Sequence, residues 1–540
     1  MVLEKLEPEL VWSIFENIIA ATPHISYHEE ELRNRLKEYV RVKSKENDLC
    51  ITILQDDKGN VLFRRPASEG LESIPSLCLQ AHLDMVPATD LPDGFDFLKN
   101  PIQPHIQENK EWVDAIGTNI GGDDGIGIAL ALALLVDPSI TYKHGSLEVL
   151  ATVEEEVGCL GGKELGVDQL DMQDTKYLIN LDGTWTGTIG FGNAAGGSLF
   201  FNKKFNRLPR DDEFYTYLHL SVSGLISGHP GSEIHLPRGN AIKIISRILT
   251  YVSQEIEIEI GNWNGGSPSI IAKTSDVIIR VKNEYYAKIE KLLSKVKQNI
   301  LRYYQNQEED WQFEPNMKIE WEDTQPVKVF SIKDSKIIIS TLNIIPHGPL
   351  EISPYSLNKL YAMYLSGKPV EVSDNVTLSS NLQMVRTQAN KIIITIRFQG
   401  NDSEEFERLF HILKQIGEIT NWEIEYSEFR PAWNSSKNSS FVQFVKEQYK
   451  NRYNAYKLKY PELGSNHINL FRFHWGMETS YFPERLPGIN MVSIGPDVQY
   501  THSPRERIHI PSVELLYNIL NDILKNFKSM FSIANKLNKF

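Results

Sequence analysis

A histidine and an aspartate two residues apart, His82 and Asp84, are the first side chains in the sequence whose spacing suggests chemistry. They follow an apolar run at residues 77–80 that predicts a buried strand. Because side chains alternate along an extended chain, both would point to one face, where the carboxylate can accept a hydrogen bond from a metal-binding histidine. On its own, an H-x-D pattern more often marks a solvated turn after a strand than a metal site. Further groups of the same kind must decide between the two interpretations.

Such groups recur at the ends of other predicted strands and loops. A glycine-rich loop at residues 118–127 contains two adjacent aspartates and leads into an apolar helix. An apolar strand at residues 146–153 runs directly into three consecutive glutamates, and a buried strand at residues 177–181 ends at an aspartate. The candidate groups are His82 with Asp84, Asp123 with Asp124, the run Glu154, Glu155 and Glu156, then Asp182, and finally His502.

Oxygen and imidazole ligands without cysteine suit Zn²⁺, Mn²⁺ or Co²⁺ at a catalytic site. Neighbouring glutamates at a strand end point in different directions, so one can bind a metal while the other acts as a base on a water molecule. Each group also has a plainer explanation: a solvated acidic run, a turn cap at Asp182, or a helix approach at His502. At the carboxyl ends of sheet strands, the whole set is better explained by a pair of metal ions in a hydrolase.

The order of the elements predicts an α/β fold with an insertion. Strands alternate with helices up to about residue 182, which favours a mostly parallel sheet with helices on both faces. Half-exposed strands and long helices at residues 240–252 and 284–304 then indicate an α+β domain with antiparallel strands, and a core strand of the first type returns at residues 488–495. The expected division is a catalytic domain at 1–189, an inserted domain at 190–402 and a second catalytic segment at 403–540.

Composition excludes several classes of protein. A chain of 540 residues is expected to form two to four domains, and its net charge of −14 disfavours binding to nucleic acid or to an anionic membrane surface. No apolar run reaches the length of a membrane span, and the first residues do not resemble a signal peptide. Three cysteines without disulfide or metal spacing favour a reducing compartment, so we expect a cytoplasmic protein.

Several blocks of the sequence resemble the M20 metallopeptidase family, most closely its branch of cytosolic aminoacyl-histidine dipeptidases. They extend from near residue 27 to beyond residue 509, with gaps in the middle third. The blocks are LQAHLDMVP, DFLKNPIQPHI, GTNIGGDDGIGIALALALL, SLEVLATVEEEVG, LINLDGT, VSGLISGHPGSEIH and MVSIGPDVQYTHSPRERIHI. A chain of blocks in this order is highly specific. The resemblance implies a zinc-peptidase type of catalytic domain with an inserted lid domain.

The resemblance also implies a role for each candidate residue of the catalytic domain. Asp123 would bridge two divalent metal ions, with zinc expected first and cobalt or manganese as alternatives. The remaining ligands would be His82 and Asp182 for one ion, and Glu156 and His502 for the other. Asp84 would orient His82, and Glu155 would be the general acid and base. The family further implies a cis peptide bond between Asp123 and the next residue.

In the lid domain, the resemblance implies residues that contact the substrate. His229, in the block SGHPG, would polarise the scissile carbonyl. Asn381 and Arg397 are the matches for residues that bind the substrate's termini. Gly476 and Glu478, in the block FHWGMET, match a segment of relatives that lies near the substrate.

Three departures from the family pattern bear on substrate range. The bridging loop has Asp124 where relatives commonly have asparagine, which adds a charge beside the metals. Pro230 follows the lid histidine where serine is more usual. The segment at residues 354–369 looks like an insertion.

The predicted function is a two-metal dipeptidase for substrates such as Xaa-His, acting as a homodimer paired through the lid domain. Two alternatives remain open. One is a related amidohydrolase, either an N-acyl amino acid deacylase or a tripeptide aminopeptidase. The other is a non-catalytic descendant that binds peptides or metal, which the presence of every expected ligand and of the base disfavours.

Overall fold

The computed structural model describes residues 2–183, 185–211, 213–231, 233–268, 270–305, 313–352, 376–461 and 468–531. The segment at 354–369, which looked inserted in the sequence, lies outside these residues. The chain divides into two compact units. Unit 1 comprises Met1–Asn193, Trp433–Arg472 and Met477–Phe540, and unit 2 comprises Ala194–Ala432 and Phe473–Gly476.

The main sheet of unit 1 is mixed, as expected for the fold class, but it is parallel only at its centre. Its order in the described residues is β1-β2-β6-β3-β7-β22-β8-β20, with β21 paired to β8. The pairs β6–β3, β3–β7 and β7–β22 are parallel, whereas the strands on either side pair antiparallel. The strands are β1 (Thr52–Gln55), β2 (Val61–Arg65), β3 (Leu77–His82), β6 (Leu147–Thr152), β7 (Tyr177–Asn180), β8 (Thr188–Asn193), β20 (Trp433–Asn434), β21 (Asn469–Phe473) and β22 (Asn490–Ser493).

Helix α3 (Gly122–Val136) lies at the centre of unit 1. Its Ala- and Leu-rich sequence makes it apolar on every side, and from Ile126 to Val136 all of its residues are buried. It packs on β3 and is also contacted by α1 and α12. The other helices of unit 1 are α1 (Glu9–Ile14), η1 (Phe15–Ile19), α2 (Glu30–Glu46), α4 (Leu160–Lys163), α10 (Ser440–Lys459), η3 (Glu478–Ser480), α11 (Phe482–Arg485) and α12 (Ile510–Asn526).

The parallel centre of the sheet brings the candidate site residues together. His82 ends β3 and is in register with Thr152, the last residue of β6. The glutamate run follows β6, and Asp182 follows β7, so all three groups lie at one edge of the sheet. A small sheet, β23-β24-β5-β4, is formed by β4 (Pro104–Ile106), β5 (Trp112–Ala115), β23 (Val498–Gln499) and β24 (Arg507–His509), and His502 lies in the loop between β23 and β24.

Unit 2 is an α+β unit built on an antiparallel sheet. The described strands have the order β14-β11-β13-β12-β17-β18-β9-β19, with β16 paired to β17, and a short pair β10–β15 lies apart. They are β9 (Ala195–Lys204), β10 (Arg207–Leu208), β11 (Tyr215–Ser223), β12 (Glu259–Gly266), β13 (Ser275–Lys282), β14 (Lys318–Asp323), β15 (Val329–Phe330), β16 (Gly348–Ile352), β17 (Val376–Gln388), β18 (Lys391–Gly400) and β19 (Glu423–Tyr426).

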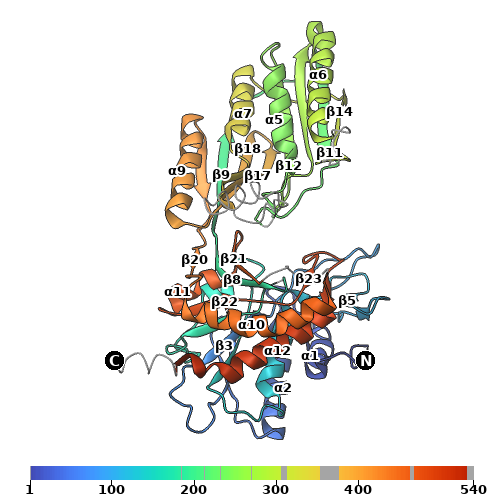
Figure 1. The fold of residues 1–540 in the computed structure, drawn as a ribbon. Coiled ribbons are helices and arrows are strands. Elements are labelled where there is room, and N and C mark those ends of the chain that lie inside the picture. The colour runs from blue at the N-terminus through green and yellow to red at the C-terminus, as the bar shows by residue number, and fades with distance from the viewer. Residues whose placement is uncertain are drawn as a thin grey trace. The chain divides into compact units, whose positions relative to one another are not determined.

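The helices of unit 2 lie side by side against the sheet (Figure 1). They are α5 (Ala241–Val252), η2 (Asn283–Tyr285), α6 (Tyr286–Tyr304), α7 (Ile332–Ile344) and α9 (Ser403–Ile419). The apolar side chains of β18 that point toward them, such as Ile396 and Phe398, are completely buried in a core shared with α9. The opposite face of β18 carries polar side chains, Arg397 and Gln399 among them.

The second boundary between the units differs from the expected one. The sequence suggested that the catalytic domain resumes at residue 403, whereas the structure assigns α9 and β19 to unit 2 and begins the next segment of unit 1 at Trp433. Strand β19 pairs with β9, and α9 packs on β9 and β18. An amphipathic helix reveals in its sequence that it covers a sheet, but not which sheet.

Two expectations from composition can be compared directly with the structure. The three cysteines form no disulfide bond with one another. Within the described residues, no helix combines the length and the apolar character needed to cross a membrane.

Candidate metal centre

Two groups of potential metal ligands in unit 1 share one residue, Asp123. The first group is His82, Asp123 and Asp182, and the second is Asp123, Glu156 and His502. Within each group, one ligand atom of every residue lies within 4.8 Å of the others. Such an arrangement can hold two neighbouring cations that share a carboxylate. These are the five residues for which the sequence suggested metal binding.

The carboxylate of Asp123 faces a different histidine with each oxygen. Its Oδ1 lies 3.3 Å from Nε2 of His82, and its Oδ2 lies 3.4 Å from Nε2 of His502. The peptide bond between Asp123 and Asp124 is cis, as the family resemblance implied. This geometry gives Asp123 the position expected of a bridging ligand.

A buried glutamate that the sequence analysis did not single out holds the loop of Asp123. Glu506 accepts hydrogen bonds from the backbone N–H groups of Asp123, at 3.1 Å, and of Gly121, at 2.9 Å. Its side chain is almost completely buried, and burial raises its pKa to about 7. Its only signal in the sequence is its place four residues after His502.

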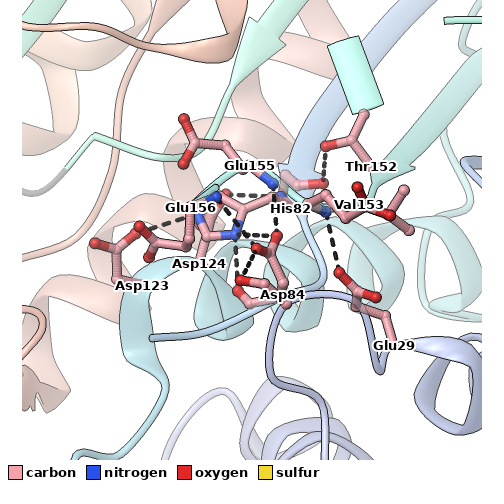
Figure 2. A network of polar contacts seen from close by, with 12 residues as sticks. Glu29, His82, Asp84, Asp123, Asp124, Thr152, Val153, Glu155 and Glu156 are labelled. Carbon is pink, nitrogen blue, oxygen red and sulfur yellow. Dashed lines mark hydrogen bonds and ion pairs between the residues drawn. The ribbon is translucent and has the colours of Figure 1, made fainter. Parts of the chain in front are cut away.

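The imidazole of His82 is oriented by Asp84 (Figure 2). Its Nδ1 lies 2.9 Å from the backbone oxygen of Asp84 and 3.5 Å from the carboxylate Oδ1 of the same residue. Because these oxygens accept hydrogen bonds, Nδ1 is the protonated nitrogen of the neutral ring, and Nε2 presents its lone pair toward Asp123. The ring therefore has the tautomer that a metal ligand requires.

The carboxylate of Asp84 also fixes the backbone of the glutamate run. Its Oδ1 accepts a hydrogen bond from the N–H of Glu155 at 2.9 Å, and its Oδ2 accepts one from the N–H of Glu156 at 3.2 Å. The hydroxyl of Ser26 donates to the same oxygen at 2.7 Å. Asp84 thus connects the ends of β3 and β6, a role that the H-x-D spacing alone does not reveal.

We expect the substitution Asp84→Asn to weaken metal binding by about 10- to 100-fold, the usual cost of losing an outer-shell partner. An amide can accept only at one atom, so at least one of the three donors would face an N–H group. Titration of the metal-free variant with Zn²⁺ measures the effect. Ser26→Ala, which removes one donor and leaves the carboxylate intact, should change the affinity less, and equal affinities for Asp84→Asn and the native chain would refute this role.

The three glutamates after β6 point to different partners. Glu154 forms an ion pair with Lys58 at 2.7 Å, and Glu156 lies 2.9 Å from Nε2 of His502 through its Oε1. Glu155 accepts a hydrogen bond from the thiol of Cys159, with 3.1 Å between Sγ and Oε1. Glu155 and Glu156 also form a third close group with His82, so Glu155 lies at the edge of the candidate metal centre.

The electrostatics of the site call for added positive charge. Burial raises the pKa of Glu156 to about 8, and burial followed by repulsion from Asp123 raises the pKa of Asp182 well above its usual value. Burial also acts to raise the pKa of Asp123, but its contacts with His502 and His82 outweigh this effect and lower it. Several buried carboxylates around two imidazoles would be costly unless cations neutralised them. The donor set therefore fits divalent metal ions.

Comparison with known proteins identifies the family. The model of peptidase family M20/M25/M40 matches residues 78–526. The chain belongs to this peptidase family.

Two proteins named as dipeptidases resemble it along nearly the whole chain. The cytosol non-specific dipeptidase of Escherichia coli is 32% identical over 97% of this chain and 98% of its own length. The crystal structure of aminoacylhistidine dipeptidase from Vibrio alginolyticus is 28% identical, with a TM-score of 0.74, covering 97% of this chain and 98% of that one. A tripeptidase from Staphylococcus aureus shares the fold, with a TM-score of 0.52 at 16% identity over 96% of this chain and 98% of that one.

In unit 2 of this M20 peptidase, two predicted substrate residues lie side by side. Asn381 on β17 is in register with Arg397 on β18. Asn381 is 2% exposed, its Nδ2 donates to the backbone oxygen of Ile270 at 3.1 Å, and its Oδ1 is buried without a partner among the described residues. His229 is exposed on a loop, where its Nδ1 accepts a hydrogen bond from the N–H of Gly231 at 3.1 Å.

Two acidic residues that the sequence associated with the substrate or the metals, Glu478 and Asp124, are buried in unit 1. Glu478 is completely buried and accepts hydrogen bonds from Thr152 at 2.6 Å and from Gln80 at 2.8 Å. Glu478 therefore connects β3 and β6. Although Gly476 and Glu478 stand in one sequence block, the chain passes from unit 2 to unit 1 between them. Asp124 is 2% exposed and accepts the backbone N–H of His82 at 3.3 Å.

Proposed function

We propose that this chain is a two-metal dipeptidase that hydrolyses the peptide bond of dipeptides such as Xaa-His. The observation that supports this most strongly is that two groups of ligand atoms share Asp123. The similarity to the dipeptidases of E. coli and V. alginolyticus extends over almost the entire chain. We assign His82, Asp123 and Asp182 to one ion, and Asp123, Glu156 and His502 to the other. Zinc is the first candidate for this nitrogen and oxygen donor set, with cobalt or manganese as alternatives.

Glu155 is the proposed general acid and base. When bound, the metal ions would lower the pKa of a water molecule and polarise the scissile carbonyl. The carboxylate of Glu155 takes the proton from the attacking water and later delivers it to the departing amine nitrogen. Burial raises the pKa of Glu155, which makes its carboxylate a stronger base than that of a solvated glutamate. Asp84 holds the backbone of Glu155 and the ring of His82 while this transfer takes place.

Unit 2 supplies the proposed contacts with the substrate. Asn381 and Arg397 bind the terminal groups of the dipeptide, and His229 donates a hydrogen bond to the oxyanion that develops on the carbonyl. Their support is the family resemblance and, for Asn381 and Arg397, the register of β17 with β18. We further propose that the protein is cytoplasmic, because the relative from E. coli is named as a dipeptidase of the cytosol. We also propose that it forms a homodimer through unit 2.

A panel of substrates tests the proposal. With Zn²⁺ bound, the purified protein should hydrolyse Ala-His far faster than Ala-Ala-His or N-acetylhistidine. Preferential cleavage of the tripeptide or of the acyl amino acid would instead assign the chain to the related amidohydrolases. Tight binding of metal without hydrolysis of any of the three would indicate a non-catalytic descendant.

A further inference from the structure

The sheet of unit 2 has a polar face, opposite the face that packs on its helices. We define this face by Ser379, Asn381, Arg397, Gln399 and Arg430. Two pairs of these residues lie directly opposite each other on β17 and β18, namely Asn381 with Arg397 and Ser379 with Gln399. Gln399 is in turn opposite Gly196 on β9, and Gly196 forms a bridge with Arg430. Residues that are directly opposite in antiparallel strands share a face, so Gln399 and the position of Gly196 belong to the same row.

The side chain of Arg430 lies over this row because two glycines leave room for it. A Cβ atom on Gly196 would lie 2.6 Å from Nη2 of Arg430, and one on Gly476 would lie 1.8 Å from its Cζ. The backbone holds the arginine in place, since its N–H donates to the oxygen of Gly196 at 2.9 Å and its oxygen accepts the N–H of Gly196 at 3.1 Å. Any larger residue at either glycine would displace the guanidinium group.

One edge of this guanidinium group has no hydrogen-bond partner within the part of the chain that the structure describes. Nε and Nη2 of Arg430 are both buried and make no hydrogen bond with the described residues. These two nitrogens form the edge on which two parallel N–H groups match the oxygens of a carboxylate. Buried donors without acceptors are unfavourable, so a ligand that supplies two acceptor oxygens fits this position.

We propose that Arg430 binds a carboxylate of the peptide substrate through its Nε and Nη2 atoms, and so determines specificity together with Arg397. This proposal rests on the proposed dipeptidase function. The carboxylate has two possible sources, the free α-carboxylate of the C-terminal residue or an acidic side chain. Gly476, which the sequence associated with substrate binding, then acts by making room for the guanidinium group.

Two substitutions of Arg430 test the proposal. Arg430→Met keeps an apolar side chain and removes the guanidinium group. Arg430→Lys keeps the positive charge without the two parallel N–H donors. We expect Arg430→Met to raise KM for the relevant dipeptide by about 10- to 100-fold, the range for a lost charge-assisted hydrogen bond, with kcat and metal content unchanged. Arg430→Lys should give a smaller increase.

Matched substrates identify the source of the carboxylate. If it is the α-carboxylate, the increase in KM appears with Ala-His and disappears with its C-terminal amide. If it is an acidic side chain, the increase appears with Ala-Glu and not with Ala-Gln. Equal effects of Arg430→Met on both members of both pairs, or no effect at all, would overturn the proposal.

Further variants separate binding from folding. Gly476→Ala should reproduce the effect of Arg430→Met, because its Cβ would occupy the place of Cζ. Arg408→Met removes an exposed arginine of α9 that pairs with Glu405 and Glu351, and it should leave KM unchanged. If Arg430→Met does not fold, Arg430→Lys and Gly476→Ala still decide the question.

Direct binding distinguishes this proposal from the proposed function. Calorimetry in the metal-loaded Glu155→Gln background gives Kd for Ala-His, Ala-Glu and their matched controls without turnover. Binding that depends on Arg430, together with a native chain that hydrolyses none of these dipeptides, would reject the dipeptidase function and retain the role of Arg430. Hydrolysis of these dipeptides by the native chain, with a Kd that does not depend on Arg430, would retain the dipeptidase function and reject the role of Arg430.

Discussion

Replacing Glu155 by glutamine should lower kcat for Ala-His by about 10²–10⁴-fold, the range that a positioned general acid and base contributes. Glutamine has nearly the same shape as glutamate but can neither take the proton of the attacking water nor return it to the leaving amine. Both metal ions should remain bound, because the two ligand groups that share Asp123 do not include Glu155. Steady-state kinetics together with metal analysis of the same sample measure both results.

Glu154→Gln is the matched control for this substitution. Glu154 is the adjacent acid of the same run, but its carboxylate pairs with Lys58, so its loss should change kcat little. A Glu155→Gln protein that turns over Ala-His at a rate comparable to the native chain would exclude Glu155 as the base. Loss of metal from that variant would instead indicate that Glu155 is a ligand, as its closeness to His82 and Glu156 allows.

Replacing Asp123 by alanine should remove the metal pair. Its two oxygens face His82 and His502, so both candidate cation sites lose a ligand at once. Loss of the several kcal/mol that metal ions contribute corresponds to a fall in kcat/KM of about 10³-fold or more. Inductively coupled plasma mass spectrometry should find fewer than two ions per chain at a Zn²⁺ concentration that saturates the native protein.

The neighbouring residue provides the control for Asp123→Ala. In Asp124→Asn, the side-chain oxygen can still accept the backbone N–H of His82, so we expect two ions per chain to remain. Two bound ions in Asp123→Ala, or equal losses of metal in the two variants, would contradict a shared carboxylate at Asp123.

The residues that meet at the sheet edge could be predicted because the physical rule is simple. Parallel strands end at the same edge, so the groups after β3, β6 and β7 must be neighbours wherever those strands pair. The sequence pattern therefore indicated His82, Asp182 and the glutamate run before the pairing itself was known. His502 lies in a loop and Asp123 in the non-helical first turn of α3, so strand pairing does not place them. The residue pattern named both as candidate ligands, and the family resemblance gave each its specific role.

Other features depend on contacts that no local pattern encodes. The support of the Asp123 loop by Glu506 joins residues almost four hundred positions apart, and such a pair leaves no periodic signal. The division at Trp433 depends on which sheet α9 covers. The space for Arg430 needs two glycines from distant segments, Gly196 and Gly476, each of which is unremarkable in its own sequence context.

The most direct test of a catalytic metal pair is to titrate metal-free protein with Zn²⁺ while Ala-His hydrolysis is followed in the same samples. We predict that two equivalents bind per chain and that activity reaches its maximum only when both are bound. Full activity with one ion or none, or failure to bind a second ion, would contradict a catalytic metal pair built around Asp123.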